Sequence, residues 1–167
     1  MVAFKQVLLA IDFEETSPDV IEMGVEVARR FDAQLIVLHA FCVYPPPYME
    51  GFYLKLEKVL HDARATLDRT VTKIRERYPK VEGVLVQGEP WEEIPRLAKK
   101  YGADLIVMGT HGRRGLPRLF LGSVAERVVR LSNVPVLTVA SPREGHPHSV
   151  DGPSQVVRAA EDAGAEV

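Results

Sequence analysis

The chain has little of what several classes of protein require. Cys42 is its only cysteine among 167 residues, which excludes a disulfide within one chain and a cysteine-based metal site. No apolar stretch reaches the roughly 18 residues that a membrane-spanning helix requires. Lysine and arginine number 21 against 23 aspartate and glutamate, without a long run of either sign, which argues against a dedicated nucleic-acid binder. We therefore expect a protein of the reducing cytoplasm that binds neither membranes nor nucleic acids.

Hydrophobic residues make up 46% of the chain, enough for one domain with a substantial core. They gather in five short apolar runs, many of them rich in β-branched residues, at residues 7–11, 35–38, 84–86, 105–108 and 134–139. Consecutive apolar positions are typical of strands that are covered on both faces, so we expect five buried strands. Because the first run follows the N-terminus so closely, it favours a folded strand over a secretory signal.

Segments with helical spacing separate these runs. The clearest has apolar residues three or four positions apart from Phe52 to Ile74. Further helices are predicted from about residue 17 to 31, 90 to 101 and 122 to 133, with Gly102 and Pro135 as stop signals. Parallel strands joined by covering helices fold most economically as an open, doubly wound α/β sheet. The sequence thus predicts a five-stranded parallel sheet of the flavodoxin or Rossmann-like type.

Two stretches interrupt this alternation. Residues 41–51 contain three consecutive prolines, at positions 45–47, and are expected to form an irregular loop. From residue 141 onward the sequence turns to proline, glycine, histidine and serine, and then to an alanine-rich acidic end. We therefore assign residues 1–140 to the folded domain and predict that residues 141–167 form a disordered tail.

The ends of the predicted strands are the first places to look for a site, because ligands of open α/β sheets bind beyond the carboxyl ends of the strands. Asp12 follows the first strand, Ala40 the second and Gly109 the fourth. The fourth strand opens the motif Gly109-x2-Gly112-x9-Gly122-Ser123, which closes at a helix start. Glycines let the backbone approach a ligand closely, and a helix N-terminus favours an anion such as phosphate. Taken alone, glycines around such a loop more often serve turn chemistry than phosphate binding.

The glycine motif, together with Val134-Pro135-Val136-Leu137, Ala10-Ile11-Asp12 and Gly88-Glu89-Pro90, resembles the universal stress protein family over about residues 3 to 140. The resemblance implies the fold of the adenine nucleotide alpha hydrolase-like group, with an ATP site that uses Mg²⁺ or Mn²⁺. In that site Asp12 would lie near the ribose, the phosphates or their metal ion. The other implied site residues are Ala10 and Ala40 at the adenine, Met108 and Gly109 beside the ribose, and Gly112, Gly122, Ser123 and Val124 at the phosphates.

One departure from the family pattern lies after Asp12, where many members have Gly-Ser or Phe-Ser. Here Phe13 is followed by Glu14 and Glu15. Two solvated acids beside a triphosphate repel it by up to about 1 kcal/mol each, or they help to hold a divalent ion. This departure bears on the affinity for ATP and leaves the fold prediction unchanged.

Several candidate site residues also have a simpler structural interpretation. Asp12 either contacts a ligand or caps the following helix. The arginines at positions 113, 114 and 118 either clamp phosphates or remain solvated. His39, inside an apolar strand, is interpreted as a satisfied core or pocket residue, and Trp91 as a packing residue of the third helix. Cys42 has no neighbouring cation in the sequence that would activate its thiol.

Function is predicted from the site. The sequence has no Walker-type loop and no metal-binding His-Glu-x-x-His helix, so a binding module is favoured over an enzyme, with ATP hydrolysis slow if it occurs. The first hypothesis is an ATP-binding regulator that couples nucleotide binding to a stress response through an unidentified protein partner. The alternatives are a metal-dependent ATP hydrolase centred on Asp12 and a dimeric scaffold that no longer uses nucleotide. The last strand, at residues 134–140, is expected at a sheet edge, and the resemblance also implies a homodimer through it.

Overall fold

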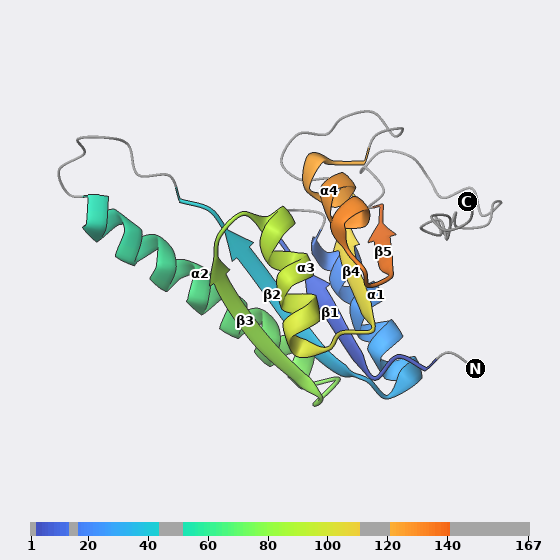
Figure 1. Ribbon diagram of the computed structural model, residues 1–167. Coiled ribbons are helices and arrows are strands. Elements are labelled where there is room, and N and C mark those ends of the chain that lie inside the picture. The colour runs from blue at the N-terminus through green and yellow to red at the C-terminus, as the bar shows by residue number, and fades with distance from the viewer. Residues whose placement is uncertain (1–2, 14–16, 44–51, 111–120, 141–167) are drawn as a thin grey trace, which may run out of the picture.

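The computed structural model describes residues 3–13, 17–43, 52–110 and 121–140, in which strands and helices alternate along the chain (Figure 1). The elements in order are β1 (Gln6–Ala10), α1 (Ser17–Phe31), β2 (Gln34–Phe41), α2 (Phe52–Arg75), β3 (Val81–Gln87), α3 (Pro90–Tyr101), β4 (Leu105–Gly109), α4 (Ser123–Leu131) and β5 (Val136–Val139). The alternation confirms the predicted order of elements. The predictions for residues 44–51 and for the tail at 141–167 lie outside the described residues.

The five strands form one sheet in the order β3-β2-β1-β4-β5, and every pair is parallel. β1 lies at the centre, paired with β2 on one side and with β4 on the other. The chain builds outward from β1 to β3, returns to the other side of β1 at β4, and ends at the edge strand β5. This arrangement confirms the predicted open, doubly wound parallel sheet and the edge position of the last strand.

Helices cover both faces of the sheet, because successive side chains of a strand point to opposite faces (Figure 1). On one face Leu9 and Val107 pack with α1 and α2 through side chains such as Val25 and Leu67. On the other face Leu8 and Ile106 pack with α3 and α4, and the buried residues there include Ile94, Leu97, Ala125 and Val128. The two apolar faces explain why the strands read as unbroken hydrophobic runs.

The bounds of α3 agree with the prediction, because both ends carry strong local signals. Pro90 occupies the first turn, where its missing N–H costs nothing, and Gly102 ends the helix in a left-handed conformation with φ of 66°. The N–H of Gly102 donates to the carbonyls of Ala98 and Lys99. The glycine supplies the positive φ that the end of the helix requires.

Several predicted bounds need correction. β2 continues to Phe41, which pairs with Gln87 of β3, so the prediction that the irregular loop begins at residue 41 is wrong at that residue. β3 begins at Val81, three residues before the predicted run. α4 ends at Leu131 and the last strand spans only Val136–Val139, shorter than the predicted 134–140. The reason lies in the connection: the hydroxyl of Ser132 donates to the carbonyl of Val134 at 2.9 Å and accepts its N–H at 3.0 Å. This local turn ends the helix early and delays the strand.

Among the residues of the predicted α2 stripe from position 56 onward, full burial is confined to the second half of the helix. Leu67, Val71 and Ile74 are buried against the sheet, whereas Val59 is 49% exposed. Figure 1 shows the reason, since the first turns of α2 extend past the sheet. Helical periodicity identified the helix correctly, but the sheet is too short to cover its whole length.

The contact between α2 and β3 depends on Gly83. A Cβ atom at this position would lie 2.8 Å from Cγ2 of Val71, and valine has little freedom to rotate within a helix. We expect Gly83→Ala to lower the free energy of unfolding by about 1 to 3 kcal/mol, as other overpacked cores do. In a Val71→Ala background the same substitution should cost clearly less, because the clashing methyl group is gone. Urea denaturation of the four proteins measures both losses, and equal losses in the two backgrounds would contradict this packing.

Candidate functional site

A cleft of about 180 Å³ opens at the carboxyl ends of β1 and β4. The strand order reverses between these two strands, and doubly wound sheets bind ligands at this point because the following loops diverge there. The cleft is bounded by the ends of the central strands and by the first turns of α3 and α4. Its described lining consists of Ala10, Ile11, Asp12, Val20, Leu38, Ala40, Pro90, Ile94, Met108, Gly109, Thr110, Gly122, Ser123, Val124 and Ala125.

The cleft brings together all but one of the residues predicted for the site. They come from the ends of three strands, the turn after β1 and the start of α4, and they line the same space: Ala10, Asp12, Ala40, Met108, Gly109, Gly122, Ser123 and Val124. The remaining predicted residue, Gly112, lies outside the described part of the chain. The same holds for Glu14, Glu15 and the arginines at 113, 114 and 118.

Sequence reasoning missed the apolar walls of the cleft. Leu38, Val20 and Ile94 line it, yet in the sequence they look like ordinary core residues. One signal was available for Leu38, since strand alternation places it on the same face as Ala40. Pro90 and Ile94 contribute through the first two turns of α3, whose start was predicted correctly.

The cleft has an apolar wall and a polar end. Ala10, Leu38, Ala40 and Met108 offer small or flexible apolar surface along the strand ends. Asp12, which is exposed, supplies the one charged side chain among the described lining residues. Thr110 and Ser123 add hydroxyl groups. Such a combination suits a ligand with a flat apolar ring at one end and polar groups at the other.

The N-terminus of α4 faces the polar end of this cleft through Gly122, Ser123 and Val124. Among the described residues no side chain caps this helix, although the first intrahelical bond, from the N–H of Glu126 to the carbonyl of Gly122, is formed at 2.9 Å. The amide groups of an uncapped first turn, together with the helix dipole, attract anions. The backbone N–H of Gly122 donates to the carbonyl of Thr110 at 2.7 Å, which fixes this helix start beside the end of β4.

His39 lies on β2 beside the cleft and not within its lining. Its Nδ1 is 2.8 Å from the carbonyl oxygen of Ile11, and its ring lies against Phe13 with a centroid distance of 4.1 Å. Burial lowers the pKa of the imidazole below its ordinary value of 6.5, and the Ile11 carbonyl and Asp12 oppose this shift without cancelling it. These contacts confirm the interpretation of His39 as a satisfied, partly buried residue.

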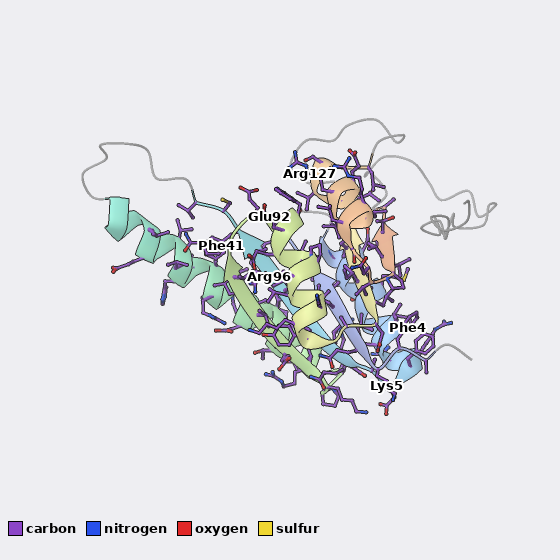
Figure 2. The ribbon with its side chains drawn as sticks, viewed as in Figure 1. Phe4, Lys5, Phe41, Glu92, Arg96 and Arg127 are labelled. Carbon is purple, nitrogen blue, oxygen red and sulfur yellow. The ribbon has the colours of Figure 1, made fainter. Side chains whose placement is uncertain are left out.

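Trp91 joins the two helices that border the cleft. It packs against the core on the α3 and α4 face. The guanidinium of Arg127, which Figure 2 labels on α4, lies 4.8 Å from the centroid of the Trp91 ring. A cation over an indole face is a favourable contact, worth about 0.5 to 1 kcal/mol at an exposed site. The predicted packing role of Trp91 is confirmed, and the residue also ties α3 to α4.

Cys42 follows the end of β2 and is exposed. Desolvation and the neighbouring carboxylate of Glu89 raise the pKa of its thiol above 9.0. Because the thiolate is the reactive form, this environment opposes nucleophilic chemistry at Cys42.

A metal ion in the cleft would depend on ligands beyond the protein side chains described. Within the described ranges, no group of three or more histidine, cysteine, aspartate or glutamate residues lies close enough together to hold one. Asp12 provides a carboxylate of the kind that Mg²⁺ prefers, and Mg²⁺ commonly completes its shell with water and substrate phosphates. The cleft therefore fits a metal ion that arrives with a phosphorylated ligand.

Comparison with known proteins agrees with this geometry. The model of the universal stress protein family matches residues 3–140. The chain belongs to the universal stress protein family. Among curated relatives, universal stress protein MJ0531 of Methanocaldococcus jannaschii is 33% identical over 144 residues, which cover 84% of this chain and 85% of the relative.

Solved structures of the family share the fold. Universal stress protein UspA from Lactobacillus plantarum superposes with a TM-score of 0.73 at 21% identity and covers 83% of this chain and 99% of its own. A universal stress protein in complex with cAMP superposes with a TM-score of 0.57 at 25% identity, and the match covers 83% of this chain and 98% of that protein's chain. In this chain, none of the helices in the described ranges combines the length and apolar character needed to cross a bilayer.

The position of His39 predicts how stability depends on pH. Because its pKa is lower in the folded protein, the unfolded chain binds a proton first as the pH falls. The stability that His39 confers is therefore present above about pH 6.5 and is lost as the pH drops toward the folded pKa. We expect NMR titration of the ring to give a midpoint below 6.5. Urea denaturation should show that His39→Asn lacks this acid-dependent loss, and a ring midpoint at or above 6.5 would contradict the assignment.

Proposed function

We propose that this universal stress protein is a cytoplasmic ATP-binding regulatory module, in which nucleotide occupancy changes the affinity for a protein partner during a stress response. One observation carries the proposal. The cleft at the strand reversal combines apolar surface from the strand ends with the N-terminus of α4, which no described side chain caps, and with the carboxylate of Asp12. An adenine nucleotide has matching parts: a flat base, a ribose with hydroxyl groups and an anionic phosphate chain.

Each part of the nucleotide has a place in this arrangement. The base would lie against the backbone of Ala10 and Ala40, the ribose beside Met108 and Gly109, and the phosphates at the first turn of α4. Gly122 is suited to this role because glycine has no side chain that would cover the backbone at the start of α4. Its backbone there is extended, with φ of −58°. Unpaired amide groups at a helix start bind phosphate in many unrelated folds.

A divalent cation fits beside Asp12. A nucleotide phosphate chain and the Asp12 carboxylate repel each other when both are ionised, and Mg²⁺ or Mn²⁺ would bridge them. The cation supplies charge neutralisation and orients the phosphates, while Asp12 holds it on the protein side. We therefore propose Asp12 as the metal-binding residue of the site.

The family comparison supports an adenine nucleotide in particular. The solved universal stress protein in complex with cAMP shares the fold of this chain at 25% identity. Binding of that ligand belongs to that protein, and it supports the choice of adenine over other bases for the present cleft.

Titration calorimetry of nucleotide-stripped protein with ATP and Mg²⁺ tests the proposal. We expect micromolar binding, and a loss of at least tenfold in affinity for the double variant Gly122→Val, Ser123→Ala. Valine fits the backbone conformation at position 122, so the new side chain should obstruct the phosphates without unfolding α4. Trp91, the single tryptophan, lies in the first turn of α3 and offers a second readout through its fluorescence.

Two aspartates provide a matched pair for the metal. Asp12→Asn should weaken binding of Mg²⁺ and ATP about tenfold and should remove the dependence of binding on the cation. Asp104 lies at the opposite end of the sheet, where its carboxylate accepts the N–H groups of Lys5 and Gln6. Asp104→Asn should therefore lower stability and leave affinity unchanged.

Absence of heat with the native protein would favour a nucleotide-free scaffold, and rapid phosphate release abolished by Asp12→Asn would favour a hydrolase.

We further propose a homodimer through β5. This strand lies at the sheet edge, and its four residues are only partly buried. The carbonyls of Pro135 and Val139 accept N–H groups from the β4 side. Because backbone groups alternate along a strand, those of Val136 and Thr138 face the open edge. An edge with outward N–H and C=O groups and apolar side chains favours pairing with a second copy.

Thr138→Pro tests this interface. Proline removes the outward N–H of position 138 and keeps the bonds to β4, because proline is tolerated on edge strands. We expect light scattering at micromolar concentration to give a dimer mass for the native protein and for Thr138→Val, and a shift toward monomer for Thr138→Pro. A monomeric native protein would contradict the interface.

A further inference from the structure

The turn that follows β1 decides where Asp12 lies. The N–H of Ile11 still donates to the carbonyl of Leu38 at 2.9 Å, which extends the strand pairing one residue beyond β1. Two residues later Phe13 has a φ of 62°, in the left-handed region that non-glycine residues seldom adopt. Asp12 stands between these two points and lines the cleft. Its direction therefore depends on what holds the peptide groups of residues 11–13.

His39 holds this turn from the opposite face of the sheet. The carbonyl oxygen of Ile11 lies 2.8 Å from Nδ1 of His39. A carbonyl can only accept, so Nδ1 must carry the proton and the neutral ring must leave Nε2 unprotonated. The residues before and after His39 on β2, Leu38 and Ala40, line the cleft. Because side chains alternate along a strand, His39 points to the opposite face of the sheet.

Aromatic contacts keep the ring in place. Phe13 lies against the imidazole with a centroid distance of 4.1 Å and a tilt of 36°, and Phe41 is stacked at 6.2 Å and 12° (Figure 2 labels Phe41). The strained backbone of Phe13 persists because its side chain packs against the ring and the core. The imidazole ring of His39 thus makes two contacts with the turn, one with the carbonyl of Ile11 and one with the side chain of Phe13.

We propose that His39 is a positioning residue of the nucleotide site, which fixes the Ile11–Phe13 turn and thereby orients Asp12 toward the phosphates and their cation. The inference rests on the proposed nucleotide-binding function. His39 does not contact the ligand in this arrangement. It acts through the backbone that presents Asp12, in the way that outer residues orient the direct ligands of many metal sites.

A double-mutant cycle separates positioning from a general structural role. His39→Leu removes the donor and keeps an apolar side chain, so calorimetry with ATP and Mg²⁺ should show about tenfold weaker binding. In an Asp12→Asn background the same substitution should change affinity by less than about twofold, because the group that it orients is already altered. His39→Asn places an amide N–H near the position of Nδ1 and should restore affinity to within about threefold of the native protein.

Leu85 provides the matched control. It pairs with His39 across β2 and β3 and packs on the same face of the sheet, outside the lining of the cleft. Leu85→Ala should loosen this face without changing affinity. In the protein without nucleotide, ¹⁵N NMR should show a protonated Nδ1 in neutral His39, and the amide signals of residues 12 and 13 should shift in His39→Leu more than in His39→Asn.

The outcomes distinguish this inference from the function on which it rests. If the native protein binds ATP and Mg²⁺ but His39→Leu behaves like Leu85→Ala, or if the losses from Asp12→Asn and His39→Leu simply add, the positioning role is wrong and the nucleotide site stands. If the native protein binds no nucleotide, the proposed function fails and this inference fails with it. A protonated Nε2 in the neutral ring would overturn the inference whatever the affinities.

Discussion

The reversal of strand order beside β1 is the constraint on which the rest of this structure depends. The chain leaves β1 toward β2 on one side and later returns to place β4 on the other side. Right-handed crossovers then carry the helices to opposite faces, so the loops after β1 and β4 must diverge at their carboxyl ends. The cleft forms there for a topological reason, and the same divergence brings Asp12 and the start of α4 to one place.

The strand pattern made most of the fold predictable, because the central strands β1, β2 and β4 carry consecutive buried apolar residues and the helices carry local signals. Pro90 and Gly102 mark α3 at both ends, and their predicted positions are correct. β3 was underestimated because Gly83 interrupts its apolar run. Gly83 leaves room for the side chain of Val71 on α2. This close contact arises from tertiary packing, so the local sequence around Gly83 carries no signal for it.

The candidate site was predictable for residues at or just beyond the end of a strand and for the glycine that precedes a helix. Asp12, Ala40 and Gly122 were found by this rule and do lie together. Its apolar walls could not be found in this way, because Leu38 and Ile94 have the same residue types and spacing as the core. The partner of His39 was equally hidden, since the carbonyl of Ile11 reaches the ring only through the pairing of β1 with β2 and the turn at Phe13.

The cleft and the edge of the sheet are joined by backbone. The carbonyl of Thr110 accepts the N–H of Gly122 at 2.7 Å, and the N–H of Thr110 donates to the carbonyl of Val139 at 2.9 Å. The backbone of Thr110 is thus hydrogen-bonded both to the start of α4 and to the last residue of β5. Coupling between two sites requires an element that both of them bias. The two hydrogen bonds of Thr110 form a continuous backbone connection between the proposed phosphate site and the proposed dimer edge.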